Sequence, residues 1–140
     1  MAIKDCFTKE WQGYNFSMSF LASYAIRAVE DAVLRAFDGE VPKGLILKTD
    51  NGPHYIAKQF GSAISMLGIH TEYIQKHTPE DNDKIESFRS SLKSDYVWPF
   101  ESSDFNCASV AIDKMFYNHN DKRPHSSIDY VLPRELGREF

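Results

Sequence analysis

The sequence has few of the features that stabilise secreted or membrane-bound proteins. Its 140 residues include two cysteines, Cys6 and Cys107, which form no Cys-x-x-Cys pair. They therefore indicate neither a disulfide framework nor a structural zinc site, and a reducing compartment is expected. No apolar run approaches the roughly 18 residues that a membrane span needs. The expected location is the cytoplasm, with no membrane partner.

An excess of positive charge is also missing. The formal net charge is −4 and the sequence pI is about 5.7, which disfavours a domain that holds nucleic acid through bulk charge. Any contact with DNA must therefore be local. With 42% hydrophobic and 26% charged residues, the composition is that of one globular domain, residues 1–140, with its own core.

The pattern of apolar residues predicts alternating strands and helices. Residues 2–19 indicate two short strands joined near Gly13, and residues 21–37 an amphipathic helix. A short apolar run at 44–47 predicts a strand covered on both faces, residues 56–67 a helix and 70–74 another strand. Further helices are expected around 85–96 and 108–116, followed by an irregular segment at about 118–140. The fold class is therefore α/β with a mixed sheet.

Two carboxylates stand out by position. Asp50 follows the strand at 44–47, and ligands of open α/β sheets gather at the carboxyl ends of strands. The plain alternative is that Asp50-Asn51-Gly52 only forms a turn. Glu86 flanks the apolar stripe of the helix expected around 85–96, with Arg89 and Lys93 following along the same edge. Here the plain alternative is a solvated helix face.

Taken together, three blocks of sequence resemble a known family. They are Thr49-Asp50-Asn51-Gly52-Pro53, the stretch Pro79-Glu80-Asp81-Asn82-Asp83-Lys84-Ile85-Glu86, and Tyr117-Asn118-His119-Asn120-Asp121-Lys122-Arg123-Pro124-His125. The chain resembles the catalytic core of bacterial insertion-sequence transposases and retroviral integrases, the DDE recombinases with an RNase H-like fold. The resemblance covers nearly the whole chain.

The resemblance implies metal-dependent phosphoryl transfer that nicks and joins DNA at transposon ends and target sites. Two Mg²⁺ or Mn²⁺ ions about 4 Å apart would be held by carboxylates. Asp50 would be the middle carboxylate and Glu86 the last. Asn51, Asn82, Arg89 and Lys93 would contact DNA. The parent protein would be a polynucleotidyl transferase.

The resemblance also has a gap, because the family has three carboxylates and the first lies on the opening strand. Asp5 stands too close to the helix at 21–37 for two further strands to fit between them. We therefore expect Asp5 to be structural, and the chain to be truncated before or within the family's first strand, with an incomplete metal site. The open strand edges predict a homo-oligomer or a rearranged sheet.

Two other functions stay open from the sequence. The chain could be a catalytically inactive fragment that acts as an oligomerisation or interaction module. It could also be an RNase H-like nuclease, since hydrolysis and strand transfer use the same metal constellation. DNA that is joined, only cleaved, or unchanged would separate the three functions.

Overall fold

The computed structural model describes residues 1–140 except 18, 20, 75–89, 91–104 and 140. The chain divides into two compact units. Unit 1 comprises residues 1–3 and 12–78, and unit 2 comprises residues 4–11 and 79–140. The hairpin near the N-terminus thus contributes to both units.

Unit 1 contains the alternation of strands and helices that the sequence predicts. Strand β1 (Ala2–Lys4) and strand β2 (Trp11–Tyr14) form one two-stranded sheet. Helix α1 (Ala22–Phe37), strand β3 (Ile46–Thr49), helices α2 (Pro53–Ile56) and α3 (Lys58–Met66), and strand β4 (His70–Tyr73) follow. Strands β3 and β4 are parallel, with Ile46 opposite His70 and Thr49 opposite Tyr73. The helix expected over 56–67 is observed as α3, which begins at Lys58 after a break at Ala57, and the short α2 before it shares only Ile56 with the expected range.

The core of unit 1 lies where α1 and α3 meet the strands. Phe60 and Ile64 of α3 are fully buried against Ala25, Val29 and Val33, which recur every four residues along α1. Side chains of β1 and β3, and of the residues directly before these strands, join this core, namely Ile3, Leu47, Met1 and Leu45. The fourfold spacing that predicted the helix is thus also the spacing that buries it.

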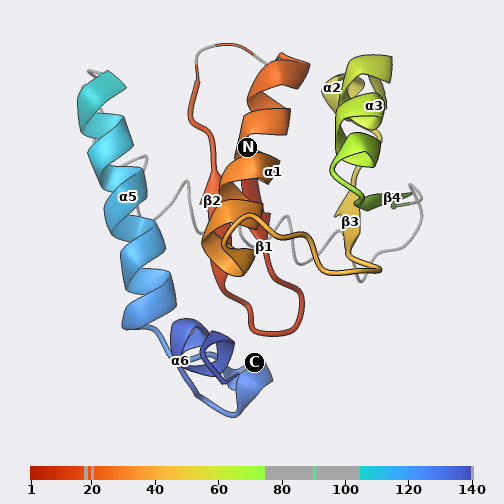
Figure 1. Cartoon of the computed structure of the whole chain (residues 1–140). Helices are drawn as coiled ribbons and strands as arrows, with labels where there is room; N and C mark the ends of the chain where they lie inside the picture. Colours follow the sequence, from red (N-terminus) through yellow and green to blue (C-terminus); the bar gives the residue numbers. More distant parts are fainter. Residues whose placement is uncertain (18, 20, 75–89, 91–104, 140) are drawn as a thin grey trace. The chain divides into compact units, whose positions relative to one another are not determined.

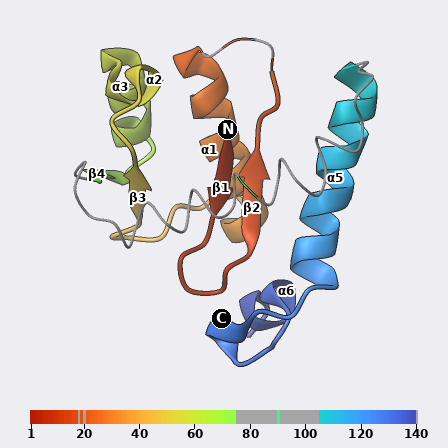
Figure 2. The ribbon, with the colours of Figure 1, turned by 180° about the vertical axis from the view of Figure 1, so that it is seen from behind.

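The turn of the hairpin differs from the prediction. It spans residues 5–10, and Gly13 lies inside β2 instead of at the turn. Figure 1, and Figure 2 from behind, show α1 alongside this hairpin. A Cβ on Gly13 would lie 2.9 Å from the carbonyl oxygen of Ala28 and 3.1 Å from the Cβ of Ala32. Glycine is therefore needed for the close approach of α1 to β2.

The strand after Gly44 is not covered on both faces by the described residues. Ile46 of β3 is 51% exposed and Lys48 is also exposed, whereas Thr49 is buried. The two sheets are separate, and no described strand pairs with both.

Unit 2 contains helix α5 (Phe105–Asp121), a short 3₁₀ turn (Ser126–Ile128) and helix α6 (Pro133–Gly137). Figure 1 shows α6 near the C-terminal end of α5. Within the segment expected to be irregular, about 118–140, α5 continues to Asp121 and α6 begins at Pro133. Proline is well suited to the first turn of a helix, where its missing N–H is not needed. Among the described helices, none is long and apolar enough to cross a membrane.

Candidate functional site at the end of β3

Asp50 lies directly after β3, at the carboxyl end of the parallel pair, as the sequence predicts. Its Oδ1 accepts a hydrogen bond from the backbone N–H of Gly52 at 3.0 Å. This bond closes the turn that leads into α2, where Pro53 occupies the first helical turn. The turn and the ligand interpretations are compatible, because the bond fixes a partly buried carboxylate at the strand end.

Further hydrogen bonds join the ends of β3 and β4 at this site. Asn51 donates from Nδ2 to the carbonyl oxygen of Ile74 at 3.3 Å, and the N–H of Ile74 donates to Thr49 at 2.9 Å. The hydroxyl of Tyr73 donates to the carbonyl oxygen of Tyr55 at 3.1 Å, which joins β4 to α2. Asn51 thus holds the strand ends together, and its contact with DNA stays a prediction.

Four of the predicted site residues, Asn82, Glu86, Arg89 and Lys93, lie outside the described residues. Within the described part of the chain, no group of three or more His, Cys, Asp or Glu side chains could hold a metal ion. The carboxylate of Asp50 has the oxygen donors that Mg²⁺ and Mn²⁺ prefer. One carboxylate alone does not form a tight metal site, so a metal bound at Asp50 would need further ligands from other residues.

Asp5 is a structural residue, as expected. Its Oδ1 accepts hydrogen bonds from the backbone N–H groups of Phe7 and Thr8, at 2.8 and 2.6 Å, and from the hydroxyl of Thr8 at 3.0 Å. These bonds cap the turn that follows β1. The role of a first metal ligand is therefore not needed to explain this carboxylate.

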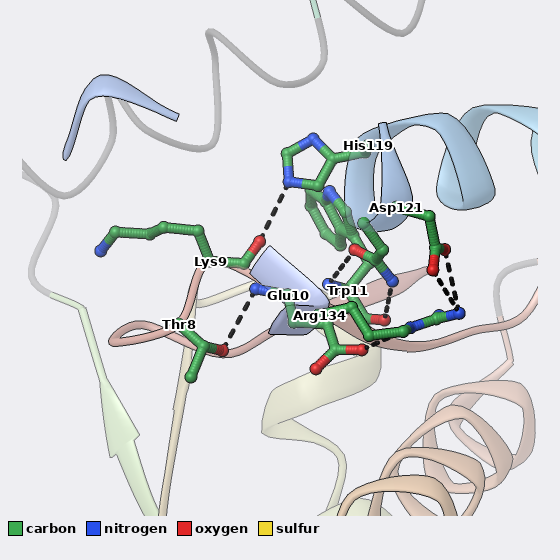
Figure 3. A network of polar contacts seen from close by, with 8 residues as sticks. Thr8, Lys9, Glu10, Trp11, His119, Asp121 and Arg134 are labelled. Atoms are coloured by element: carbon green, nitrogen blue, oxygen red, sulfur yellow. Dashed lines mark hydrogen bonds and ion pairs between the residues drawn. The ribbon is translucent and has the colours of Figure 1, made fainter. Parts of the chain in front are cut away.

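Unit 2 contains a polar network that the sequence did not predict. Asn120, at 1% exposure, lies on α5 and bonds the backbone of Trp11 twice. Its Oδ1 accepts from the N–H of Trp11 at 2.9 Å, and its Nδ2 donates to the carbonyl oxygen of Trp11 at 3.0 Å. Figure 3 shows Trp11 among the side chains of this network. The side-chain amide of Asn120 thus supplies an acceptor for the N–H and a donor for the C=O of Trp11, as the backbone of a neighbouring strand would.

Two histidines belong to the same network, with the His119 ring edge-on to Trp11 and the His125 ring tilted against that of His119. The His119 ring lies 5.8 Å from the Trp11 ring and 4.4 Å from the His125 ring, measured between centroids. The Nε2 atom of His119 lies 3.0 Å from the carbonyl oxygen of Lys9 (Figure 3). Burial lowers the pKa of His119 from 6.5 to about 4, with smaller opposing and supporting effects from the Lys9 carbonyl and nearby cations. His119 is therefore neutral at pH 7.

Arg134 of α6 joins two acidic residues of this unit. Its Nε donates to Glu10 at 3.1 Å, and its Nη1 lies 2.9 Å from Asp121. Both carboxylates are less exposed than the guanidinium between them. No pattern in the sequence indicated that Arg134 pairs with these carboxylates, because they lie 124 and 13 positions away along the chain.

Comparisons with known proteins agree with this arrangement of elements. Residues 67–133 match the family model of the integrase core domain. The resemblance to transposase and integrase cores is confirmed. The matched stretch begins directly after α3 and ends at the first residue of α6.

Curated relatives are transposases of bacterial insertion sequences. The chain is 29% identical to the transposase of insertion sequence element IS904 from Lactococcus lactis over 137 residues, which cover 94% of this chain and 51% of that protein. It is 32% identical over 109 residues to the transposase InsD of insertion element IS2 from Escherichia coli, covering 77% of this chain and 36% of that protein. The chain thus spans about half or less of the length of these relatives.

Solved structures with a similar fold are retroviral integrases. The catalytic core domain of BIV integrase matches with a TM-score of 0.68 at 18% identity, covering 99% of this chain and 84% of that one. The HTLV-2 integrase catalytic core, described in complex with magnesium in a dimeric form, matches with a TM-score of 0.66 at 18% identity, covering 98% and 81%. The fold class of an integrase catalytic core is therefore confirmed.

Proposed function

We propose that this chain is the catalytic-core segment of an insertion-sequence transposase and takes part in phosphoryl transfer on DNA in the cytoplasm. The observation that carries the proposal is the position of Asp50 at the carboxyl end of the β3–β4 pair, within a fold that matches integrase catalytic cores. The similarity to curated transposases supports DNA as the substrate.

In this proposal Asp50 and Glu86 hold Mg²⁺ or Mn²⁺, and a third ligand comes from a residue not yet assigned. When bound, the metal would lower the pKa of an attacking water or hydroxyl and stabilise the charge on the leaving oxygen. Asp50 is held for this role by the N–H of Gly52. Asn51 keeps the ends of β3 and β4 together, while Asn82, Arg89 and Lys93 are proposed to contact DNA.

Mn²⁺-dependent nicking of supercoiled DNA, with joining of a labelled 3′-hydroxyl end, tests the proposal. Asp50→Asn and Glu86→Gln should each lower both activities by more than about 100-fold, since loss of an outer-shell partner alone costs about 10–100-fold. Asp38→Asn is the matched control. Asp38 caps α1 at φ 52°, a left-handed conformation that asparagine also adopts, so activity should not change.

Each outcome of this assay separates the candidate functions. Cleaved but never joined DNA would favour an RNase H-like nuclease. Equal activity in Asp50→Asn and the parent chain would overturn the proposed role of Asp50. No activity in any chain, including one extended upstream by the family's first strand, would favour an interaction module without catalysis.

We also propose that the chain associates with further copies through the open edge of β3. The carbonyl oxygens of Leu45 and Thr49 accept from β4, so the backbone groups of Ile46 and Lys48 point to the opposite edge. Among the described residues no strand pairs with this edge, and its backbone groups beside the exposed Ile46 side chain favour pairing with another strand.

Light scattering over a range of concentrations tests this association. Ile46→Pro removes an N–H from the open edge without touching the ladder to β4, so it should shift the equilibrium toward monomer. Lys58→Gln, an exposed change on α3, should leave the equilibrium unchanged. A monodisperse monomer at every concentration would contradict the proposal.

A further inference from the structure

Two hydrogen bonds join the residues on either side of Asp50 to the end of β4. The carbonyl oxygen of Thr49, directly before Asp50, accepts from the N–H of Ile74 at 2.9 Å. Asn51, directly after Asp50, donates from Nδ2 to the carbonyl oxygen of Ile74 at 3.3 Å. Both bonds end at Ile74, so they hold the chain next to Asp50 but do not reach α2.

The hydroxyl of Tyr73 adds a third bond to β4, farther along the turn. It donates to the carbonyl oxygen of Tyr55 at 3.1 Å. Tyr55 lies in α2, which has only four residues, and the last carbonyl groups of a helix have no partner within the helix. The hydroxyl thus supplies a donor from outside the short helix and attaches the turn after Asp50 to β4 at a second residue.

Tyr55 connects this bond both to the core of unit 1 and to the carboxylate. Its ring lies edge-on to the fully buried ring of Phe60, with 5.5 Å between the centroids. Its N–H donates to the carbonyl oxygen of Gly52 at 2.9 Å, and the N–H of Gly52 donates to Oδ1 of Asp50 at 3.0 Å. A continuous series of contacts therefore joins the Tyr73 hydroxyl to the carboxylate of Asp50.

We propose that Tyr73 is a positioning residue, whose hydroxyl fixes the Asp50 carboxylate in the orientation in which it binds a divalent cation. Partners that orient a ligating carboxylate strengthen metal binding, because the ligand is ordered before the metal arrives. The choice of a cation as the ligand rests on the proposed function. The attachment of the Asp50 turn to β4 rests on the hydrogen bonds alone.

Amide hydrogen exchange of the full chain, followed by NMR in the absence of metal, tests the attachment. Tyr73→Phe removes the hydroxyl and keeps the ring. The N–H groups of Gly52 and Tyr55 should then exchange about two- to tenfold faster, the factor that corresponds to the loss of a hydrogen bond worth about 0.5–1.5 kcal/mol. Unchanged exchange rates at both residues would overturn the proposal, because the hydroxyl would then not hold the turn.

A titration with Mn²⁺ alone tests the positioning. A paramagnetic ion at Asp50 should broaden the NMR signal of the Gly52 N–H, which is bonded to that carboxylate, and Asp50→Asn should abolish this broadening. In Tyr73→Phe, half of the full broadening should require a several-fold higher Mn²⁺ concentration. The titration is done where the variant is fully folded, so a loss of global stability does not produce this shift.

Two controls accompany the titration. Tyr24→Phe removes an identical hydroxyl from α1, outside the Asp50 turn, and should bind Mn²⁺ as the parent does. Broadening of the Gly39 N–H, next to the exposed Asp38, measures non-specific binding to a surface carboxylate and should be equal in all chains. Equal weakening in Tyr24→Phe and Tyr73→Phe would overturn the proposal, because the effect would then not depend on the bond to Tyr55.

The titration also separates this inference from the proposed function. No broadening at Gly52 in the parent chain would overturn the role of Asp50 in metal binding, and the inference with it. Broadening in the parent that Tyr73→Phe reproduces at the same Mn²⁺ concentration would overturn the role of Tyr73 alone and leave the proposed function standing.

Discussion

Replacing Asn120 with alanine should be among the most destabilising single changes in unit 2. The variant removes two hydrogen bonds, of 2.9 and 3.0 Å, from the backbone of Trp11. A buried group deprived of its partner costs about 1–3 kcal/mol, and the small cavity adds to this. We therefore expect a loss of about 2–5 kcal/mol, a large fraction of the roughly 5–15 kcal/mol of a typical domain.

Urea unfolding followed by far-UV circular dichroism measures this loss. With a slope of about 1–3 kcal/mol per molar urea, the midpoint should fall by about 1–2 M. Asn118→Ala, two residues earlier on α5 and only partly buried, is the matched control and should change the midpoint little. A midpoint for Asn120→Ala within about 0.3 M of the parent would refute the reasoning, because the two bonds would then contribute nothing net.

Three further changes test other parts of the fold. Gly13→Ala should destabilise the chain by about 1–3 kcal/mol, because the new Cβ would lie 2.9 Å from a carbonyl oxygen of α1. In the same unfolding assay, Gly61→Ala should stabilise the chain by about 0.5–1 kcal/mol, because a Cβ at this position inside α3 meets open space. Because the folded pKa of His119 is lowered to about 4 from 6.5, its contribution is present above pH 6.5 and is lost as pH falls toward 4. The full shift of the pKa corresponds to about 3 kcal/mol, and solvent screening of the partly exposed ring reduces this to about 1–2 kcal/mol. If His119→Gln had the same pH profile of stability as the parent, the proposed contribution of His119 would be contradicted. Arg134→Gln should destabilise by about 1–2 kcal/mol, since two partly buried carboxylates lose their cation, and thermal melts at low and high salt should show the difference shrinking as salt rises.

Elements with a regular apolar period were predictable from the sequence. The fourfold spacing of Ala25, Val29 and Val33 predicted α1 and its buried face, and residues 70–74 predicted β4. The position of Asp50 after a strand also followed, because strand ends can be located from the turn residues that come next. These signals lie within each segment, so they can be interpreted without knowing which other segment packs against it.

Gly13 shows why other features were not predictable. Glycine is frequent in turns, so its place in the sequence suggested the turn of the hairpin. The structure instead uses it for the close approach of Ala28 and Ala32 of α1. That requirement is set by packing between distant segments, and no pattern within residues 2–19 contains it.

Asn120 illustrates the same principle in unit 2. An asparagine near the end of a helix is usually interpreted as a solvent-exposed or terminal residue, yet here it is buried and bonds a residue 109 positions away. These bonds hold Trp11, over which Lys4 lies, and Trp11 contacts His119, which holds the backbone of Lys9. Asn120 therefore supports the packing of Trp11 against His119 and, through His119, the turn that contains Lys9. It follows that Asn120→Ala should change the near-UV circular dichroism of Trp11 even under conditions in which the chain stays folded, and that Asn118→Ala should not.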